Sequence, residues 1–333
     1  MDRRSVEIFD KQSEYILAEA AGCFGVAPSD LQKLGSFESY VYEYVRDGSS
    51  YILKLTHSLH RTMAQIEGEL EWINFLADNG VPVGRAFPAT DGQLPARIDL
   101  DDSYFLAYSF GKSSGAHITK DDWNEKLFIK WGRLTGRMHA LAKMFSPSDR
   151  SRKRFEWHED ESLKVEKYIP ADQEIIIEKC NSLKGRLRKL DTDDEAYGLI
   201  HSDLHHGNFF INNGDIIPFD FDDCHYNWFA YDLGIPLFYA LRSTFVTGDK
   251  MAFAEKFMSA FMTGYNEENK LAAEWFKYIP YFMKMREMDL YIIIHAEGAF
   301  LENKWCSDYM EGRREKIEND IPVIDLDFSR FAV

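Results

Sequence analysis

The sequence has 333 residues, enough for one large or two medium domains that bury a substantial core. Its 45% hydrophobic and 28% charged residues are typical of an ordinary globular protein. The net charge of −16, from 39 basic and 55 acidic residues, argues against nucleic acid and anionic membrane surfaces as partners.

The chain carries no recognisable targeting or membrane segment. Its first residues, MDRRSVEIFDKQSE, lack an apolar signal, and no run approaches the length of a membrane span. The cysteines are scattered without a CxxC pair, which is typical of free thiols in a reducing compartment. We therefore expect a cytoplasmic protein without a membrane partner. The four cysteines are Cys23, Cys180, Cys224 and Cys306.

The first part of the chain predicts a helix followed by an antiparallel sheet. Apolar residues recur at near-helical spacing over 5–22, and 31–56 then alternates as three strands. Asp47-Gly48 fits the turn of a hairpin between the second and third strands. Backbone N–H groups of the first hairpin loop could bind phosphates. The loop residues expected near a nucleotide are Gly35, Ser36 and Ser39.

A lysine and a glutamate follow in the next two predicted elements. Lys54 lies in an otherwise apolar strand, where alternation places it on the same face as Ile52. The segment 65–80 has the apolar face of a helix, with Glu69 beside that face. Glu69 is the first candidate for a partner of Lys54, and Glu67 is the alternative.

The rest of the chain is mostly helical outside one short region. The segment 102–111 predicts a strand that leads into a connector. Long amphipathic or apolar runs then predict helices. These runs cover 121–144, 173–190, 224–242, 250–265 and 271–302, and His139 among them looks like a core histidine.

The exception is the stretch 198–223, GLIHSDLHHGNFFINNGDIIPFDFDD. Its pattern predicts short strands around a polar loop, and Asn213-Gly214 is a strong signal for a hairpin turn. The hairpin would fold Asp220 back next to Asn208. The expected elements are strands at Gly198–His201, Asn208–Ile211 and Ile216–Phe219, with the loop at Ser202–Gly207.

These residues supply the groups that phosphoryl transfer needs. One carboxylate orients the acceptor hydroxyl and takes its proton, while an amide oxygen and a second carboxylate hold Mg²⁺. A metallophosphoesterase is the alternative, because Asp203-Leu-His205 and Asp223-Cys-His225 are Asp-x-His pairs that could bind metals. The order of motifs along the chain, with Lys54 upstream, favours the kinase interpretation.

The spacing His201-x-Asp203-x4-Asn208 followed by Asp220 resembles the catalytic segments of the aminoglycoside phosphotransferase and choline kinase superfamily. The resemblance covers nearly the whole chain. It implies an α+β, two-lobed, protein-kinase-like fold with an antiparallel sheet and helices in the first lobe and a mostly helical second lobe. The implied lobes are 1–107 and 108–333.

The resemblance also implies a role for each motif residue. Asp203 would be the catalytic carboxylate, and Asn208 and Asp220 would bind Mg²⁺. Lys54, oriented by Glu69, would bind the phosphates of ATP, with GTP as the alternative nucleotide. His201 and Asp232 would brace the catalytic loop, and Asp222 would contact the metal or the acceptor. The backbone of a hinge at Phe105 to Phe110, including Tyr108, would bind adenine.

The acceptor side carries no specific motif. Asp223 adjoins the catalytic hairpin, and Arg286, Asp289 and Glu297 fall on one side of a helix, so they are candidates for an acceptor pocket. We expect a small hydroxyl compound such as an amino alcohol, amino sugar or aminoglycoside-like molecule. The alternatives are a protein Ser/Thr kinase of the bacterial stress-response type and a nucleotide-binding protein without activity.

Overall fold

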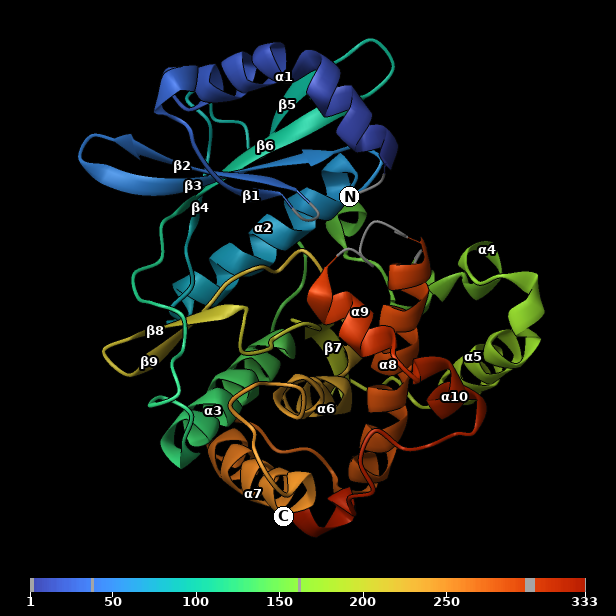
Figure 1. The fold of residues 1–333 in the computed structure, drawn as a ribbon. Coiled ribbons are helices and arrows are strands. Elements are labelled where there is room, and N and C mark those ends of the chain that lie inside the picture. Colours follow the sequence, from blue (N-terminus) through green and yellow to red (C-terminus); the bar gives the residue numbers. More distant parts are fainter. Residues whose placement is uncertain (1–2, 37–38, 161–162, 297–302, 333) are drawn as a thin grey trace. The chain divides into compact units, whose positions relative to one another are not determined.

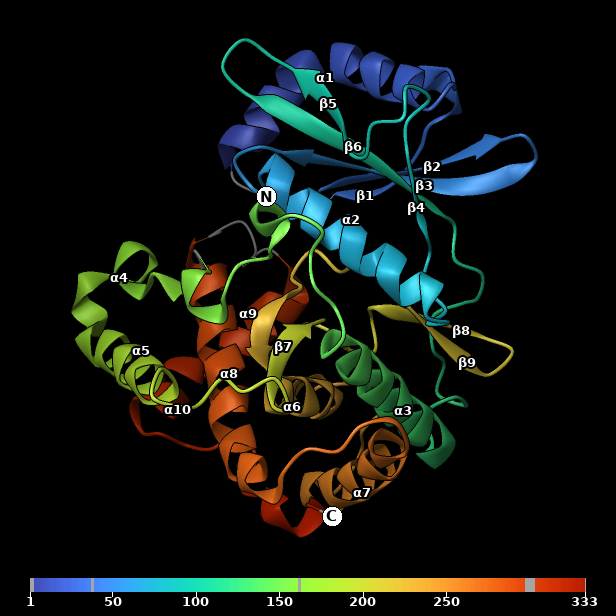
Figure 2. The same ribbon diagram turned by 180° about the vertical axis from the view of Figure 1, so that it is seen from behind.

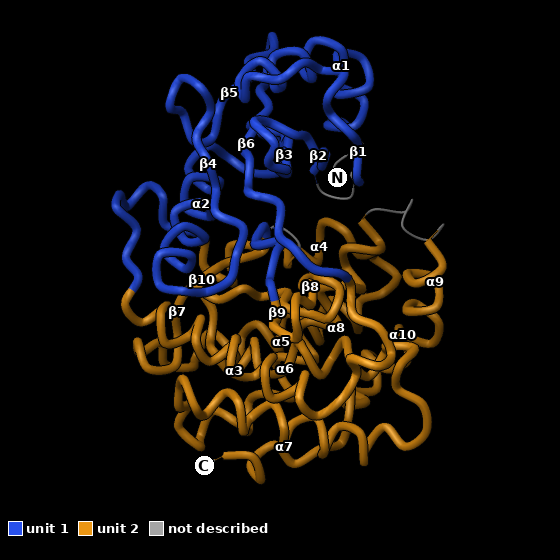
Figure 3. Tube along the Cα trace, turned by 90° about the vertical axis from the view of Figure 1, so that its left-hand side faces the viewer, with its two compact units in different colours: residues 1–116, 145–154, 217–222 blue, residues 117–144, 155–216, 223–333 orange. Residues whose placement is uncertain are grey.

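The computed structural model describes residues 3–36, 39–160, 163–296 and 303–332. The chain forms two compact units, which Figure 3 distinguishes by colour. Unit 1 consists of Met1–Ala116, Phe145–Arg154 and Ile217–Asp222, and unit 2 of His117–Met144, Phe155–Ile216 and Asp223–Val333. A lobe boundary between residues 107 and 108 stays a prediction.

Unit 1 is built on an antiparallel sheet with the order β1-β2-β3-β6-β4, in which β5 also pairs with β6. The expected hairpin turn is present, with positive φ at Asp47 (52°) and Gly48 (76°). The elements are α1 (Arg3–Cys23), β1 (Gln32–Ser36), β2 (Tyr40–Arg46), β3 (Ser49–His57), α2 (Met63–Asp78), β4 (Ala86–Phe87), β5 (Ala96–Asp99) and β6 (Tyr104–Gly111).

Helices α1 and α2 cover opposite faces of this sheet (Figure 1). Successive side chains of a strand point to opposite faces. Phe105 and Ala107 of β6 accordingly pack in the core beneath α1, whereas Leu106 and Tyr108 pack against α2. Both faces of β6 are therefore buried, which explains its nearly continuous apolar sequence.

A capping box sets the start of α2. The side chain of Thr62 accepts a hydrogen bond from the backbone N–H of Gln65, and the Gln65 side chain accepts one from the backbone N–H of Thr62. This pair satisfies two backbone donors that a helix terminus leaves open. The helix therefore begins at Met63, two residues before the predicted start, and Glu69 lies on its buried side.

Unit 2 is mostly helical, with a two-stranded sheet of β7 and β10 and the strand β8, which forms a hairpin with β9 (Figure 2). The last residues of β9, Ile217 and Pro218, are assigned to unit 1. The turn at Asn213-Gly214 forms as predicted, with φ of 50° and 84°. The elements are α3 (Glu125–Ala142), α4 (Val165–Tyr168), α5 (Glu174–Leu187), β7 (Tyr197–Ile200), β8 (Phe209–Asn212), β9 (Asp215–Pro218), β10 (His225–Trp228), α6 (Phe229–Ala240), α7 (Lys250–Glu268), α8 (Ile279–Ala296), α9 (Lys304–Met310) and α10 (Arg313–Glu318).

Helices α3 and α7 pack with their backbones in close contact. A Cβ atom on Gly132 would lie 1.8 Å from the carbonyl oxygen of Phe261, and one on Gly264 would lie 1.8 Å from that of Ile129. Neither position accepts a side chain without separating the helices. This contact fixes α3, which carries the buried His139.

The α+β fold with an antiparallel sheet is confirmed. The sequence did not predict β10, which replaces the start of the apolar helix expected over 224–242. Among the described residues, no helix is both long enough and apolar enough to cross a membrane.

Candidate active site

The loop between β7 and β8, in unit 2, carries the predicted catalytic residue. Asp232 of α6 is buried and accepts hydrogen bonds from the backbone N–H groups of His201 (3.1 Å) and Ser202 (3.0 Å). Ser202 adopts a φ of 70°, a left-handed conformation that a residue other than glycine rarely takes. The Asp232 carboxylate therefore holds a strained backbone immediately before Asp203.

His139 supports Asp232 from α3. Its Nε2 lies 3.4 Å from Oδ2 of Asp232, and its Nδ1 lies 3.0 Å from the hydroxyl of Tyr265. Asn269 donates a further hydrogen bond to the Tyr265 hydroxyl. Burial lowers the pKa of His139, so the imidazole is neutral at neutral pH. The histidine is a core residue, as the sequence analysis expected, and it connects α3 and α7 to the loop.

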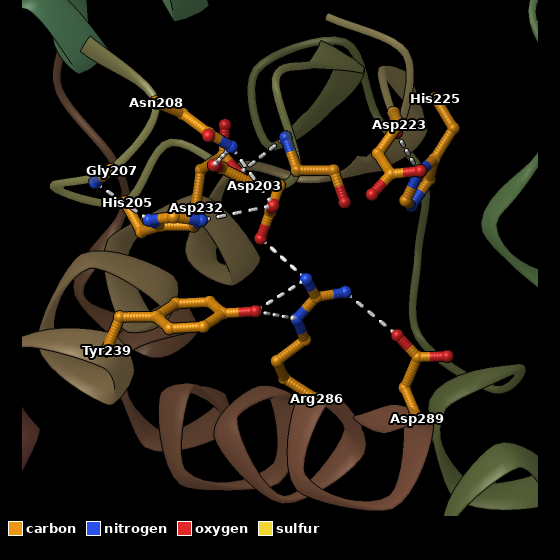
Figure 4. A network of polar contacts seen from close by, with 11 residues as sticks. Asp203, His205, Gly207, Asn208, Asp223, His225, Asp232, Tyr239, Arg286 and Asp289 are labelled. Carbon is orange, nitrogen blue, oxygen red and sulfur yellow. Dashed lines mark hydrogen bonds and ion pairs between the residues drawn. The ribbon is translucent and has the colours of Figure 1, made fainter. Parts of the chain in front are cut away.

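The Asp203 carboxylate is held from several sides (Figure 4). The amide nitrogen of Asn208 donates to the Asp203 carbonyl (2.9 Å) and to Oδ2 (3.1 Å), and His205 Nε2 lies 3.5 Å from Oδ2. Arg286 of α8 donates to Oδ1 at 2.5 Å. The structure thus brings together Asp203, Asn208 and Arg286 within unit 2.

Arg286 is itself anchored by two further residues of unit 2. Its Nη1 donates to Oδ2 of Asp289 at 2.9 Å, while Nε and Nη2 donate to the hydroxyl of Tyr239 at 3.1 and 2.7 Å. Arg286 and Asp289 thus share a helix face as predicted, but they bind each other. Glu297, the third member of that stripe, lies outside the described residues.

Asp223 lies in unit 2, directly after the segment that carries the predicted metal ligand Asp220. Its backbone carbonyl accepts a hydrogen bond from Nδ1 of His225 at 2.8 Å (Figure 4). This contact is a local turn between neighbours in sequence. It gives no support to an acceptor contact from Asp223, which stays a prediction.

Lys54 and Asp220 form an ion pair within unit 1. Nζ of Lys54 lies 3.0 Å from Oδ1 of Asp220, whose φ of 63° is again left-handed. Burial by itself lowers the pKa of Lys54, but neighbouring carboxylates, Asp220 foremost, raise that pKa well above its ordinary value. Lys54 is therefore a fixed positive charge beside a carboxylate of which 48% is exposed.

Glu69 is buried in unit 1 near Lys54 but makes no ion pair with it in the described structure. Burial raises the pKa of Glu69 to about 7, while the charge of Lys54 opposes this shift. Its Oε2 has no hydrogen-bond partner among the described residues. Glu67, the alternative partner, pairs with Arg152 at 3.3 Å instead. Glu69 therefore lies near Lys54 as expected, but the residue that forms an ion pair with Lys54 is Asp220.

Asp222 is buried in unit 1, and its predicted contact with a metal or acceptor stays a prediction. His60 Nε2 lies 2.8 Å and Arg61 Nη2 lies 3.0 Å from Oδ2 of Asp222, and Arg154 donates to the Asp222 carbonyl. Burial alone raises the pKa of Asp222, but Arg61 and His60 outweigh it and hold that pKa well below its ordinary value. These contacts fix the segment that carries Asp220 to the loop after β3.

The predicted phosphate loop is described only in part. Gly35 and Ser36 pair with Val41 and Tyr40 at the end of β1, where the register is irregular. Ser39 is buried before β2. The two residues between Ser36 and Ser39 lie outside the described residues, so the phosphate role of this loop stays a prediction.

The expected hinge residues Phe105 and Tyr108 lie inside strand β6. Phe105 pairs with His57 of β3 on one side and Ile98 of β5 on the other, and Tyr108 pairs with Lys54. Their side chains lie in the two cores of unit 1, and the Tyr108 hydroxyl bonds Thr56 at 2.9 Å. These pairings do not test an adenine contact from either residue, which stays a prediction. The connector begins only after Gly111.

Four residues that hold these groups were not found in the sequence analysis. His60, Arg61 and Arg154 anchor Asp222, and Tyr239 anchors Arg286. No local pattern distinguishes such residues, because each contact joins segments that are far apart in sequence.

Asn208 of unit 2 and Asp220 of unit 1 each carry an oxygen of the kind that binds a hard cation. Because the Asn208 amide nitrogen donates to Asp203, its oxygen is left without a hydrogen-bond partner among the described residues. Only Oδ1 of Asp220 is paired, which leaves Oδ2. Amide and carboxylate oxygens are the ligands that Mg²⁺ and Ca²⁺ take. Within the described residues, no group of three or more His, Cys, Asp or Glu side chains is arranged to hold a metal.

Comparisons with known proteins identify the family of the chain. The sequence model of the phosphotransferase enzyme family APH matches residues 30–271. Amicoumacin kinase of Bacillus subtilis (strain 168) is 40% identical over 321 residues, covering 95% of each chain.

Two solved structures are similar to the whole chain. Amicoumacin kinase hAmiN in complex with AMP-PNP, Ca²⁺ and Ami is 37% identical, with a TM-score of 0.93 and complete coverage of both chains. A microcompartment-associated aminopropanol kinase is 21% identical, with a TM-score of 0.72 over 92% of this chain and 96% of the other, and it shows the fold alone. These matches decide against the metallophosphoesterase alternative. The chain belongs to the APH phosphotransferase enzyme family and is an ATP-dependent small-molecule kinase.

Proposed function

We propose that this kinase transfers the γ-phosphoryl group of ATP to a hydroxyl group of amicoumacin or a closely related compound. The observation that carries the proposal is the 40% identity to an amicoumacin kinase over 95% of both chains. The TM-score of 0.93 to a kinase in complex with AMP-PNP, Ca²⁺ and Ami supports it. A protein substrate is the weaker alternative, because these relatives act on a small molecule.

Asp203 is proposed to orient the acceptor hydroxyl and to take its proton. Support comes from its place in the loop held by Asp232 and from the contacts that fix its carboxylate. Positioned proton transfer contributes about 10²–10⁴-fold to a rate. Because phosphoryl transfer has a largely dissociative transition state, alignment and charge neutralisation supply most of the remainder.

Lys54 is proposed to bind the α- and β-phosphates, as strand lysines do in kinases. Its support is a buried ammonium group whose partner, Asp220, is itself a predicted metal ligand. A nucleotide with its cation would give the Lys54 ammonium and the Asp220 carboxylate new partners of opposite charge. ATP is preferred to GTP because the similar kinase structure carries an adenine nucleotide analogue.

Asn208 and Asp220 are proposed to hold Mg²⁺, through the amide oxygen of one and the unpaired carboxylate oxygen of the other. When bound, the cation neutralises charge on the transferred phosphoryl group. We further propose that the enzyme works in the cytoplasm, where ATP is available, which also suits the free cysteines described.

A comparison of acceptors tests the proposal. The enzyme is incubated with ATP and Mg²⁺ and, separately, with amicoumacin, aminopropanol and an aminoglycoside, while ADP release and product mass are followed. We expect the highest kcat/KM for amicoumacin, with one phosphoryl group per ADP. Preference for aminopropanol or for the aminoglycoside would reject amicoumacin as the acceptor.

A further inference from the structure

Arg286 lies at the centre of a buried network in unit 2 and only 6% of it is exposed. It projects from α8 toward Asp203, and its guanidinium donates four hydrogen bonds to protein acceptors (Figure 4). Of its five N–H groups, only one has no acceptor among the described residues. An anionic acceptor molecule would therefore find little of this side chain to bind.

The two anchors of Arg286 restrict how its guanidinium can move. Asp289, three residues along the same helix, holds Nη1 at 2.9 Å, and the Tyr239 hydroxyl from α6 accepts from both Nε and Nη2. Contacts from two helices act on three nitrogens of a planar group, so its plane is fixed. A fixed donor plane fixes the direction from which Nη2 reaches Asp203.

The two oxygens of Asp203 are held differently. Oδ1 accepts from Arg286 at 2.5 Å, whereas Oδ2 accepts from Asn208 at 3.1 Å and lies 3.5 Å from His205 Nε2. The shortest contact is also the one whose donor is locked by other residues. A reacting group displaced by about 1 Å can cost roughly 10²-fold in rate, so such locking matters for alignment.

We propose that Arg286 is a positioning residue, which fixes the Asp203 carboxylate for the acceptor hydroxyl and does not bind the acceptor itself. This inference rests on the proposed function of Asp203. It assigns Tyr239 and Asp289 the task of holding Arg286, and it removes Arg286 and Asp289 from the predicted acceptor pocket.

The test is Arg286→Lys, which keeps the charge but cannot bridge Asp203, Tyr239 and Asp289 at once. We expect kcat to fall by roughly 10–10²-fold, with KM for ATP and KM for the acceptor each within about threefold of the wild type. The wild type is measured with the same acceptor, so a failure of the proposed function shows in the wild type before any variant is compared.

Arg313→Lys is the matched control. Arg313 is a buried arginine, 8% exposed, that pairs with Glu287 of the same helix α8 but does not contact Asp203. Both substitutions disturb a buried arginine–carboxylate pair, so both are expected to lower the melting temperature. Only Arg286→Lys should lower kcat. Equal losses of kcat in the two variants would overturn the proposal, since general destabilisation would then explain both.

Two further measurements separate positioning from structural support. In the Asp203→Asn background, Arg286→Lys should cost less than about threefold, because its effect passes through Asp203. In Arg286→Ala, guanidinium chloride at non-denaturing concentration should restore part of kcat. An undiminished cost in the double variant, or equal guanidinium effects on Arg286→Ala and Arg313→Ala, would contradict the inference.

Tyr239→Phe covers the case in which Arg286→Lys does not fold. It removes one hydroxyl group and leaves the contact between Arg286 and Asp203 in place. We expect a fall in kcat of roughly threefold to tenfold with unchanged KM values, since Arg286 would lose one of its two anchors. An unchanged kcat in the folded Tyr239→Phe variant would overturn the proposal.

Discussion

The ammonium group of Lys54 is paired with the carboxylate of Asp220 at 3.0 Å, so the predicted phosphate ligand and the predicted metal ligand neutralise each other within unit 1. The sequence predicted a different partner, Glu69, which lies buried without an ion pair in the described structure. The pairing makes Lys54 and Asp220 mutually dependent: loss of either charge leaves the other without its partner.

Replacement of Lys54 by Met should therefore lower kcat/KM for ATP more than kcat/KM for the acceptor. We expect kcat/KM for ATP to fall by at least about 10²-fold, because a fixed positive charge for the phosphates is lost. Steady-state kinetics with varied ATP measure this. Lys112→Met is the control, since Lys112 is a lysine of the same unit that pairs with Glu43 at 2.7 Å. Similar losses in both variants would mean that Lys54 has no special role.

Replacement of Asp203 by Asn should keep ATP binding within a few-fold and cut turnover by at least about 10²-fold. The amide retains the shape of the side chain but cannot accept the proton of the acceptor. Binding of AMP-PNP by calorimetry and turnover by ADP release separate the two effects. Near-normal turnover would remove Asp203 from the catalytic role.

Removal of the cation should abolish activity, and ATP should bind weakly without Mg²⁺. Asp220→Ala is expected to lose both the activity and the dependence of ATP binding on Mg²⁺, because it removes a proposed ligand. Asp215→Ala is the matched control, since Asp215 is an exposed carboxylate of β9 that pairs with Lys130. ATP binding that does not respond to EDTA in the wild type would contradict the metal assignment.

The contribution of His139 to the stability of the protein should fall as the pH drops below about 6.5. Burial lowers the pKa of His139 from its ordinary value of 6.5, so in this range His139 binds more protons in the unfolded chain than in the folded chain. The stabilising effect of a neutral His139 is fully present above pH 6.5 and is lost as the pH falls. Melting temperatures between pH 8 and pH 5 measure this dependence.

His139→Asn should reduce the acid dependence of the melting temperature, although it also lowers the melting temperature at neutral pH by breaking a buried contact with Asp232. His158→Gln, at an exposed histidine of the same unit, is the control for a surface substitution. An acid dependence identical in His139→Asn and the wild type would show that His139 does not contribute to it.

Local sequence patterns predicted the elements that rest on local physics. The turns at Asp47-Gly48 and Asn213-Gly214 formed because these residues tolerate positive φ. Helix α2 appeared close to its predicted range because its apolar periodicity and its capping box agree. The spacing of His201, Asp203 and Asn208 likewise placed all three in or beside one loop, because that spacing is a property of the local chain.

Contacts between distant segments were not predictable in this way. The partner of Lys54 depends on where residues 217–222 return to unit 1. The sequence did not separate strand from connector around Phe105 and Tyr108, because a buried strand and an apolar connector share the same composition. Arg286 lies on a polar helix face, and no sequence pattern could predict its contact with Asp203, because the two residues are far apart in the chain.

Product analysis tests the central claim most directly. Wild-type enzyme, ATP, Mg²⁺ and amicoumacin are incubated together, and the mass of the acceptor is measured along with ADP. The account predicts amicoumacin that carries one added phosphoryl group on a hydroxyl, in amounts equal to the ADP formed, and no product with Asp203→Asn. Phosphate found on a generic protein substrate or on the enzyme itself, with amicoumacin unchanged, would contradict the account.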